Sequence, residues 1–151
     1  MLSLLRTTSE NTDFQLLVKL LDHDLAARDG DEAVFYAQYN KITLIRHAVV
    51  AYHDTKPVGC GAFKEFGPGT VEIKRMYVQP AHRQQGVARA VLGELEQWAH
   101  ELHYTACVLE TGRRQPEAIA LYQRCGYAFT ENYGQYVGVA NSVCLRKALS
   151  Q

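Results

Sequence analysis

The most informative segment for the fold is VEIKRMYVQPAHRQQGVARAVLGELEQWAHEL (residues 71–102), because its hydrophobic pattern changes once, near the middle. The apolar residues of VEIKRMYV (71–78) predict a strand, whereas from Gly86 to about Leu102 they recur every three or four residues and predict a helix. The next segment, TACVLETG (105–112), predicts a buried strand. Strand, helix and strand in this order predict a parallel pair of strands joined by a crossover helix.

Further strands and helices are predicted on both sides of this unit. Upstream, TLIRHAVVAYHD (43–54) and PVGCGAFKEF (57–66) predict a hairpin, so three consecutive antiparallel strands precede the crossover. Downstream, Pro116 suits the first turn of a helix that ends before Gly126. Short strands over 127–129 and 142–149 complete the chain.

The N-terminal region predicts two more helices after a short apolar opening. Ser9 or Asn11 caps the first, and Gly30 ends it. Its apolar face is expected to hold residues spaced by three and four, namely Leu16, Leu17, Leu20, Leu21 and Leu25. DEAVFYAQYN (31–40) predicts a shorter one. The elements together predict a single domain over 1–151 with a layered α/β (α+β) fold. Its sheet is mixed but mostly antiparallel, with about seven strands, one parallel pair and about four helices.

Composition and charge exclude several classes of protein. The 151 residues are 47% hydrophobic and 21% charged, with 16 basic and 16 acidic side chains, so no basic surface for nucleic acid or anionic lipid is expected. No apolar run approaches the ~20 residues that span a bilayer. The N-terminus lacks the basic start of a secretory signal, which favours a cytoplasmic location. Four scattered cysteines without a C-x-x-C pair predict reduced thiols and no metal site.

The loop and helix start at residues 79–93 favour an anion. No acidic residue occurs in this stretch, although the first turn of a helix usually favours Asp or Glu, and His82, Arg83 and Arg89 supply basic groups. Gly86 would let a phosphate or pyrophosphate approach the unpaired backbone amides. The alternative is a hydrated helix start with an ordinary glycine turn. Neither a P-loop nor a G-x-G-x-x-G dinucleotide motif is present.

These residues resemble the GNAT N-acetyltransferases. The run from Arg83 to Ala88 is similar to their acyl-CoA signature, Q/R-x-x-G-x-G/A, and Val78 and Pro80 are similar to the V-x-P that commonly ends their fourth strand. LYQRCGY (121–127) resembles their L-Y-x-x-x-G-F/Y element. The resemblance is sharp over residues 71–129 and extends elsewhere only to the order of elements.

The resemblance implies acetyl-CoA as co-substrate, bound in a V-shaped opening between splayed parallel strands. The pantetheine arm would pair with the backbone near residues 76–78, and the pyrophosphate would rest on backbone amides of residues 83–89. Many members carry Asn where this chain has Gln115, whose longer side chain keeps the amide. The expected cofactor-binding residues are Met76, Tyr77, Val78, Arg83, Gln84, Gln85, Gly86, Val87, Ala88, Arg89 and Gln115.

Acetyl transfer to an amine needs a base for the amine and a proton for the leaving thiolate. The resemblance matches Glu72 to a glutamate used as general base by some members, and Tyr122 to a tyrosine near the sulfur of coenzyme A. The alternatives are an exposed Glu72 paired with Lys64 or Lys74, and a Tyr122 that only packs in the core. Glu110 ends the strand beside the opening and could bind the amine or replace Glu72.

The acceptor is less well specified. In the family the helices before the first hairpin and the C-terminal strands commonly wall the acceptor site, and the first 40 residues hold seven acids against three bases, which suits a cationic amine. We expect an N-acetyltransferase that acts on a small primary amine by direct attack, with a homodimer as a further possibility. The alternatives are a peptide or protein N-acetyltransferase, a non-catalytic acyl-CoA sensor and an interaction domain without cofactor. The expected aromatic lining is Phe35, Tyr36, Tyr39, Tyr133 and Tyr136.

Overall fold

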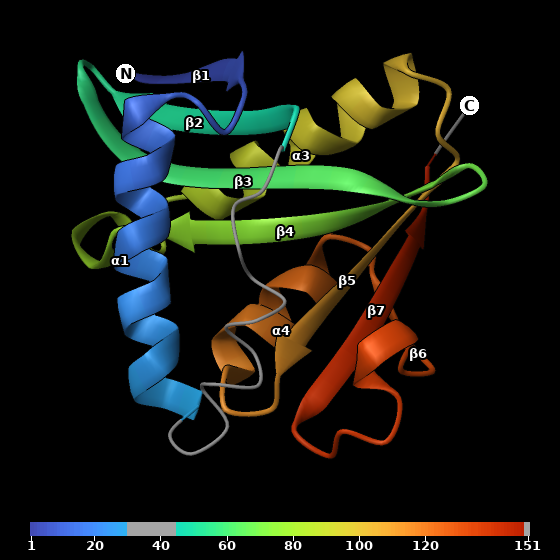
Figure 1. The fold of residues 1–151 in the computed structure, drawn as a ribbon. Helices are drawn as coiled ribbons and strands as arrows, with labels where there is room; N and C mark the ends of the chain where they lie inside the picture. Colours follow the sequence, from blue (N-terminus) through green and yellow to red (C-terminus); the bar gives the residue numbers. More distant parts are fainter. Residues whose placement is uncertain (30–44, 150–151) are drawn as a thin grey trace.

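The computed structural model describes residues 1–29 and 45–149 and contains a seven-stranded sheet in the order β1-β2-β3-β4-β5-β7-β6 (Figure 1). Every neighbouring pair is antiparallel except β4 and β5, which are parallel, as the sequence predicted. The strands are β1 (Leu2–Thr7), β2 (His47–His53), β3 (Lys56–Gly67), β4 (Thr70–Val78), β5 (Ala106–Gly112), β6 (Ala128–Thr130) and β7 (Ser142–Ala148).

Helices cover both faces of this sheet. Helix α1 (Thr12–Asp29) packs on one face, while α3 (Val87–Glu101) and α4 (Pro116–Arg124) belong to the core on the other face (Figure 1). Two short 3-10 turns, η2 (Pro80–His82) and η3 (Gly134–Tyr136), lie in loops. The described residues thus hold three α-helices rather than four, because the helix expected over 31–40 lies outside them. No helix in the described ranges has the length and apolar character needed to cross a bilayer.

The parallel pair separates soon after it forms. Strands β4 and β5 pair only where residues 70–72 meet residues 106–108, and beyond that point they diverge (Figure 1). The remainder of β4 stays paired with β3, and the whole of β5 is paired with β7. The divergence leaves a gap between two halves of one sheet, at the ends of β4 and β5 from which α3 and α4 follow.

Helix α1 has the predicted start but a different buried face. The side chain of Asn11 accepts a hydrogen bond from the Phe14 N–H at 2.9 Å, so Asn11 and not Ser9 is the cap. Leu16 and Leu20, expected on the inner face, are 48% and 37% exposed. The buried face of α1 instead includes Phe14, whose ring is fully buried against β2 and β3. The other buried apolar residues of α1 are Leu17, Val18 and Leu21.

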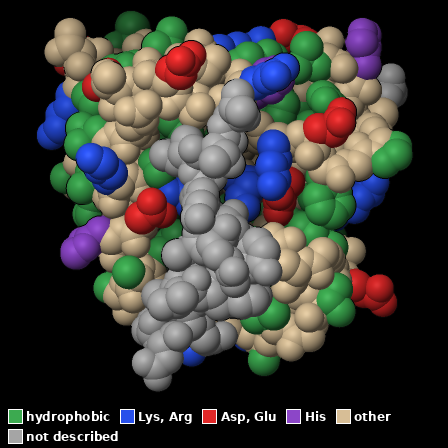
Figure 2. Space-filling model, viewed as in Figure 1, with side chains coloured by type: hydrophobic (Ala, Val, Ile, Leu, Met, Phe, Trp, Pro, Cys, Tyr) green, Lys and Arg blue, Asp and Glu red, His purple; other side chains and the backbone are tan. Residues whose placement is uncertain are grey.

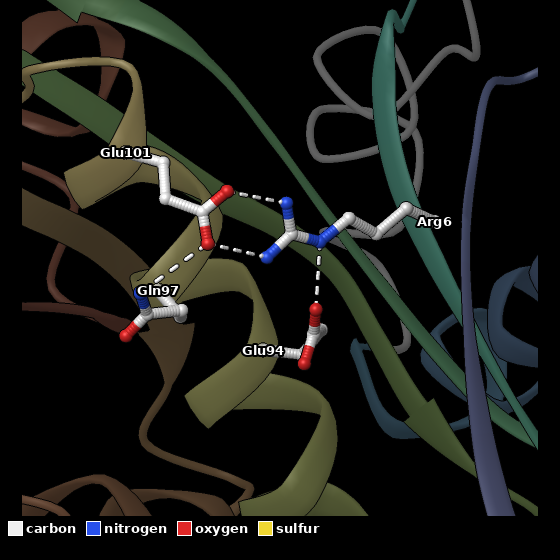
Figure 3. A network of polar contacts seen from close by, with 4 residues as sticks. All are labelled: Arg6, Glu94, Gln97 and Glu101. Atoms are coloured by element: carbon white, nitrogen blue, oxygen red, sulfur yellow. Dashed lines mark hydrogen bonds and ion pairs between the residues drawn. The ribbon is translucent and has the colours of Figure 1, made fainter.

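The edge strand β1 is tied to α3 by a polar network (Figure 3). The Arg6 guanidinium donates to the Glu94 carboxylate at 2.6 Å and to both Glu101 oxygens at 2.8 and 3.0 Å. Gln97 donates to the same Glu101 carboxylate at 3.2 Å. This fork joins residues about 90 positions apart and fixes the far end of α3 to the sheet.

Candidate active site

The start of α3 is an open helix N-terminus. Gly86 precedes the helix with a φ of 81°, in the left-handed region that favours glycine, and no side chain caps the helix. The first helical hydrogen bond runs from the Ala90 N–H to the Gly86 carbonyl at 3.0 Å. The N–H groups of Val87, Ala88 and Arg89 precede that bond, and the first turn contains no acid. These donors and the helix dipole suit an anion.

Arg83 is held in place at the end of β4. Its Nε donates to the Val78 carbonyl at 2.8 Å, its guanidinium lies 5.6 Å from the centre of the Tyr77 ring, and it reaches Asp24 of α1 at 3.9 Å. Its backbone N–H donates to the Pro80 carbonyl at 3.3 Å. This amide is one of those predicted from the sequence to bind the anion. The η2 turn uses it instead, so the open amides begin after Arg83.

A groove of about 600 Å³ runs past this helix start toward α4. Ten of the eleven residues expected to bind a cofactor line it, and Gln85 is the exception. Residues of α1 and α4 also line the groove, among them Leu21, Asp24 and Ala118, which the sequence analysis did not expect there. Leu121 and Cys125 of the LYQRCGY element line it as well.

A smaller cavity of about 110 Å³ adjoins the groove. Both are lined by Leu21, Met76, Gln115, Ala118 and Tyr122, so they meet at these side chains. The small cavity lies where β4 and β5 diverge, and its wall brings together the charged residues Glu72, Lys74, Arg75 and Glu110. Over β3 and β4, basic and acidic side chains lie next to one another (Figure 2). A groove for a long ligand thus leads to a small charged chamber.

Glu72 is a buried carboxylate with two partners. Its side chain is 4% exposed, the Tyr133 hydroxyl donates to Oε2 at 2.7 Å, and Lys64 Nζ lies 3.8 Å from Oε1. The pairing with Lys64 expected for a purely structural Glu72 is therefore present, but the exposure expected with it is wrong. Burial and the Glu72 charge raise the pKa of Tyr133, which keeps that hydroxyl protonated as a donor.

Tyr122 lies on α4 at the junction of the groove and the chamber. Its ring packs edge-on against Tyr127 with centroids 5.9 Å apart, and the residue is 7% exposed. Burial is the main reason that its pKa is raised, so its hydroxyl is protonated at neutral pH. Within 1–29 and 45–149, no side chain forms a hydrogen bond with this hydroxyl. The proton is therefore available to a ligand.

The expected substrate-binding residues divide into three groups. Glu110 and Tyr136 line the chamber. Tyr133 reaches it through Glu72 and packs against Phe66 and Tyr136, with ring centroids 4.6 and 5.9 Å away. Phe35, Tyr36 and Tyr39 lie outside the described residues.

The cysteines are poor candidates for carrying an acyl group. All four thiols are free, and Cys60, Cys107 and Cys144 are buried. Burial raises the pKa of Cys60 and Cys107 to about 12 and that of Cys144 to about 11, so these thiols stay protonated and weakly nucleophilic. In the described part of the chain, no three His, Cys, Asp or Glu side chains are grouped as metal ligands.

Sequence reasoning missed Lys74 and Arg75 as site residues. Strand β4 has an irregular register opposite Gly61, and Arg75 takes a φ of 61° there. The bulge turns Arg75 toward α1, on the same side as Lys74, although adjacent strand residues ordinarily face opposite sides. No glycine, proline or other local signal marks this position in the sequence, because the bulge is set by the pairing with β3.

The chain belongs to the GNAT acetyltransferases, a family of acyltransferase enzymes. Residues 14–127 match the model of this family, described as "Acetyltransferase (GNAT) family". Among its relatives is an IAA acetyltransferase of Azospirillum brasilense, 36% identical over 102 residues that make up 67% of each chain.

Solved structures have the same fold. A protein of Klebsiella pneumoniae, provisionally described as an acyl-CoA N-acyltransferase, superposes with a TM-score of 0.82 at 29% identity over 99% of both chains. The PaiA N-acetyltransferase of Thermoplasma acidophilum, solved in complex with coenzyme A, has a TM-score of 0.72. It is 16% identical and covers 98% of this chain and 99% of its own.

Proposed function

We propose that this protein transfers an acetyl group from acetyl-CoA to a primary amine of a small molecule. The observation that carries the proposal is the junction at Tyr122, where a long groove with an open helix N-terminus meets a chamber that holds the buried Glu72. A diphosphate at the N–H groups of Val87 to Arg89 would direct the attached arm along β4 toward Tyr122. The family and the coenzyme A bound by a protein of the same fold support this choice of donor.

The chemistry follows from the two buried groups. The amine nitrogen attacks the thioester carbonyl, a C–N bond forms and the C–S bond breaks, while Glu72 takes the proton that the amine loses, directly or through water. Tyr122 gives its proton to the departing thiolate. Burial raises the pKa of Tyr122 and so keeps its hydroxyl protonated, which means that a proton is present at this position when the thiolate departs.

Direct transfer is preferred to an acyl-enzyme. A cysteine intermediate would need a thiolate, and burial raises the pKa of Cys107 to about 12, which keeps that thiol protonated. Cys125 lines the groove, and among the described residues no hydrogen bond joins its thiol to a basic side chain. Both substrates then bind together, and the small size of the chamber favours a compact acceptor over a folded protein.

The test is release of free thiol from acetyl-CoA in the presence of a panel of small amines and short peptides. We expect turnover with at least one small amine and a loss of about 10²-fold or more in kcat for Glu72→Gln, the range of a general base. Turnover with peptides alone would replace the proposal with a peptide N-acetyltransferase. Binding of acetyl-CoA with no turnover for any amine would indicate a sensor.

A further inference from the structure

Arg75 is the least satisfied buried group in the described structure. Its side chain is 2% exposed, and a single nitrogen, Nη2, has a partner, Asp22 Oδ1 of α1 at 2.5 Å. Its Nε and Nη1 are buried without any hydrogen-bond partner, and within 1–29 and 45–149 they are the only buried side-chain donors left so. A buried guanidinium with unpaired N–H groups is unfavourable unless a ligand supplies acceptors.

The charged residues around Arg75 indicate which kind of ligand would fit the chamber. Arg75 lines the chamber that also contains Glu72 and Glu110, so one wall carries a cation and another carries carboxylates. Lys74 adds a second basic group, and burial lowers its pKa while the nearby Glu72 charge opposes that shift. A polyamine or an aminoglycoside would bring only positive charge against the buried guanidinium. A ligand with an amine at one end and an anion at the other matches both walls.

Resting on the function proposed above, we propose that the acceptor is a small amino acid, whose carboxylate binds Arg75 while its amine faces Glu72. The Cα atoms of these residues are roughly 10 Å apart along β4, three steps of about 3.3 Å. Because both side chains are long and line one chamber, an amino acid of a few carbons spans them. A carboxylate is preferred to a phosphate because a second negative charge would be repelled by Glu72 and Glu110.

The experiment compares amino acids with acceptors that differ only in the acid group. Glycine, 3-aminopropionate and 4-aminobutyrate are assayed beside their amides and the corresponding alkylamines, with thiol release from acetyl-CoA as readout. We expect at least one amino acid to exceed its amide by 10-fold or more in kcat/KM. Amides or alkylamines that react as well as the acids overturn the inference and leave the proposed function standing. Failure of every amine, acids included, removes the proposed function itself.

Variants separate carboxylate binding from a purely structural Arg75. Arg75→Gln should raise KM for the amino acid on the order of 10–100-fold. It should leave KM for the amide and the affinity for acetyl-CoA unchanged. Asp22→Asn removes the ion pair but keeps the guanidinium, so it should retain the preference for the acid. Equal loss of preference in both variants would show that Arg75 only tethers α1. Arg146→Gln, at an exposed residue outside both cavities, is the matched control.

A binding measurement keeps the inference testable if Arg75→Gln does not fold. The wild-type protein saturated with coenzyme A is titrated with 3-aminopropionate and, separately, with its amide, and heat is recorded. We expect a saturable signal from the acid and at least 10-fold weaker binding of the amide. Equal affinities, or no binding of the acid, would overturn the role of Arg75 without reference to turnover.

Discussion

At the scale of single residues, the Tyr122 hydroxyl has the strongest chemical implication. Tyr122→Phe removes the proton that we assign to the leaving thiolate and changes no hydrogen bond among the described side chains. We expect kcat to fall about 10²-fold or more, while the Kd for acetyl-CoA changes less than about 3-fold. Steady-state kinetics and calorimetry measure the two effects.

Tyr127→Phe is the matched control for that variant. The Tyr127 ring packs against Tyr122, but its hydroxyl donates to Glu96 at 2.9 Å, and the residue lines neither cavity. The control should lose about 1 kcal/mol of stability and keep kcat within about 3-fold. A similar loss of kcat in both variants would mean that packing of the tyrosine pair, and not the Tyr122 proton, matters for turnover.

At the scale of elements, the contact between α3 and the sheet depends on Gly61. A Cβ at this position would meet Met76 Sδ and would lie 2.9 Å from side-chain carbons of both Val91 and Leu95. Gly61→Ala should therefore lower the free energy of unfolding by about 1–3 kcal/mol, measured by urea denaturation. Gly93→Ala is the control, because a Cβ there meets nothing within 4 Å, and alanine in a helix should stabilise the protein by about 0.5–1 kcal/mol. Changes of the same sign would contradict this account.

The link between β1 and α3 predicts a dependence of stability on pH. Hydrogen bonds from Arg6 lower the pKa of Glu101 from 4.5 to about 2. A carboxyl whose pKa falls on folding stabilises the folded protein when the pH is above the pKa of that carboxyl in the unfolded chain. This contribution to stability disappears as the pH drops from about 4.5 to about 2. Glu101→Gln should thus melt slightly below the wild type at pH 7, and the two should converge near pH 2.

The size of this effect is limited by solvent, since the Glu101 side chain is 46% exposed. Raising the salt concentration should shrink the difference in melting temperature at pH 7. In an Arg6→Met background, Glu101→Gln should change the melting temperature very little. A difference that persists at pH 2, or in that background, would assign the effect to something other than the ion pair.

At the scale of the whole molecule, local periodicity was enough to predict the sheet, and long-range contacts were not. The pattern over residues 71–112 predicts β4, α3 and β5 and their parallel pairing, because each element is long and has one clear period. The hydrogen bond of Tyr133 to Glu72 joins residues 61 positions apart, and no local signal encodes it. The inner face of α1 was also missed, because leucines occur on two adjacent faces.

The site residues also divide into those that local motifs predict and those that long-range contacts determine. Gly86, Arg83 and Tyr122 were found from motifs that lie within single loops or helices, and the structure brings them to one groove. Arg75 was missed because a left-handed conformation at an arginine is imposed by the neighbouring strand and not by its own preference. Arg75, to which we assign the carboxylate of the acceptor, is thus harder to predict from sequence than the motif residues that line the groove.

The groove also couples ligand binding to the stability of the whole chain. Its walls come from both halves of the divided sheet, β4 with α3 on one side and α4 on the other, so acetyl-CoA should bind only the folded protein. At ~100 times its Kd it should add about 2.7 kcal/mol to the free energy of unfolding. For a chain of this length that is a rise of roughly 5–10 °C in melting temperature, measured by a thermal scan.

A pair of variants at Gly86 tests whether the helix start is the point of contact. Gly86→Ala and Gly86→Glu both force a side chain into a φ of 81°, so both should lose about 1–2 kcal/mol without ligand. Only Gly86→Glu adds a carboxylate where the diphosphate would lie, so it should lose most of the rise caused by acetyl-CoA, while Gly86→Ala should keep most of it. A full rise in Gly86→Glu would place the diphosphate elsewhere and leave the open amides of α3 to water.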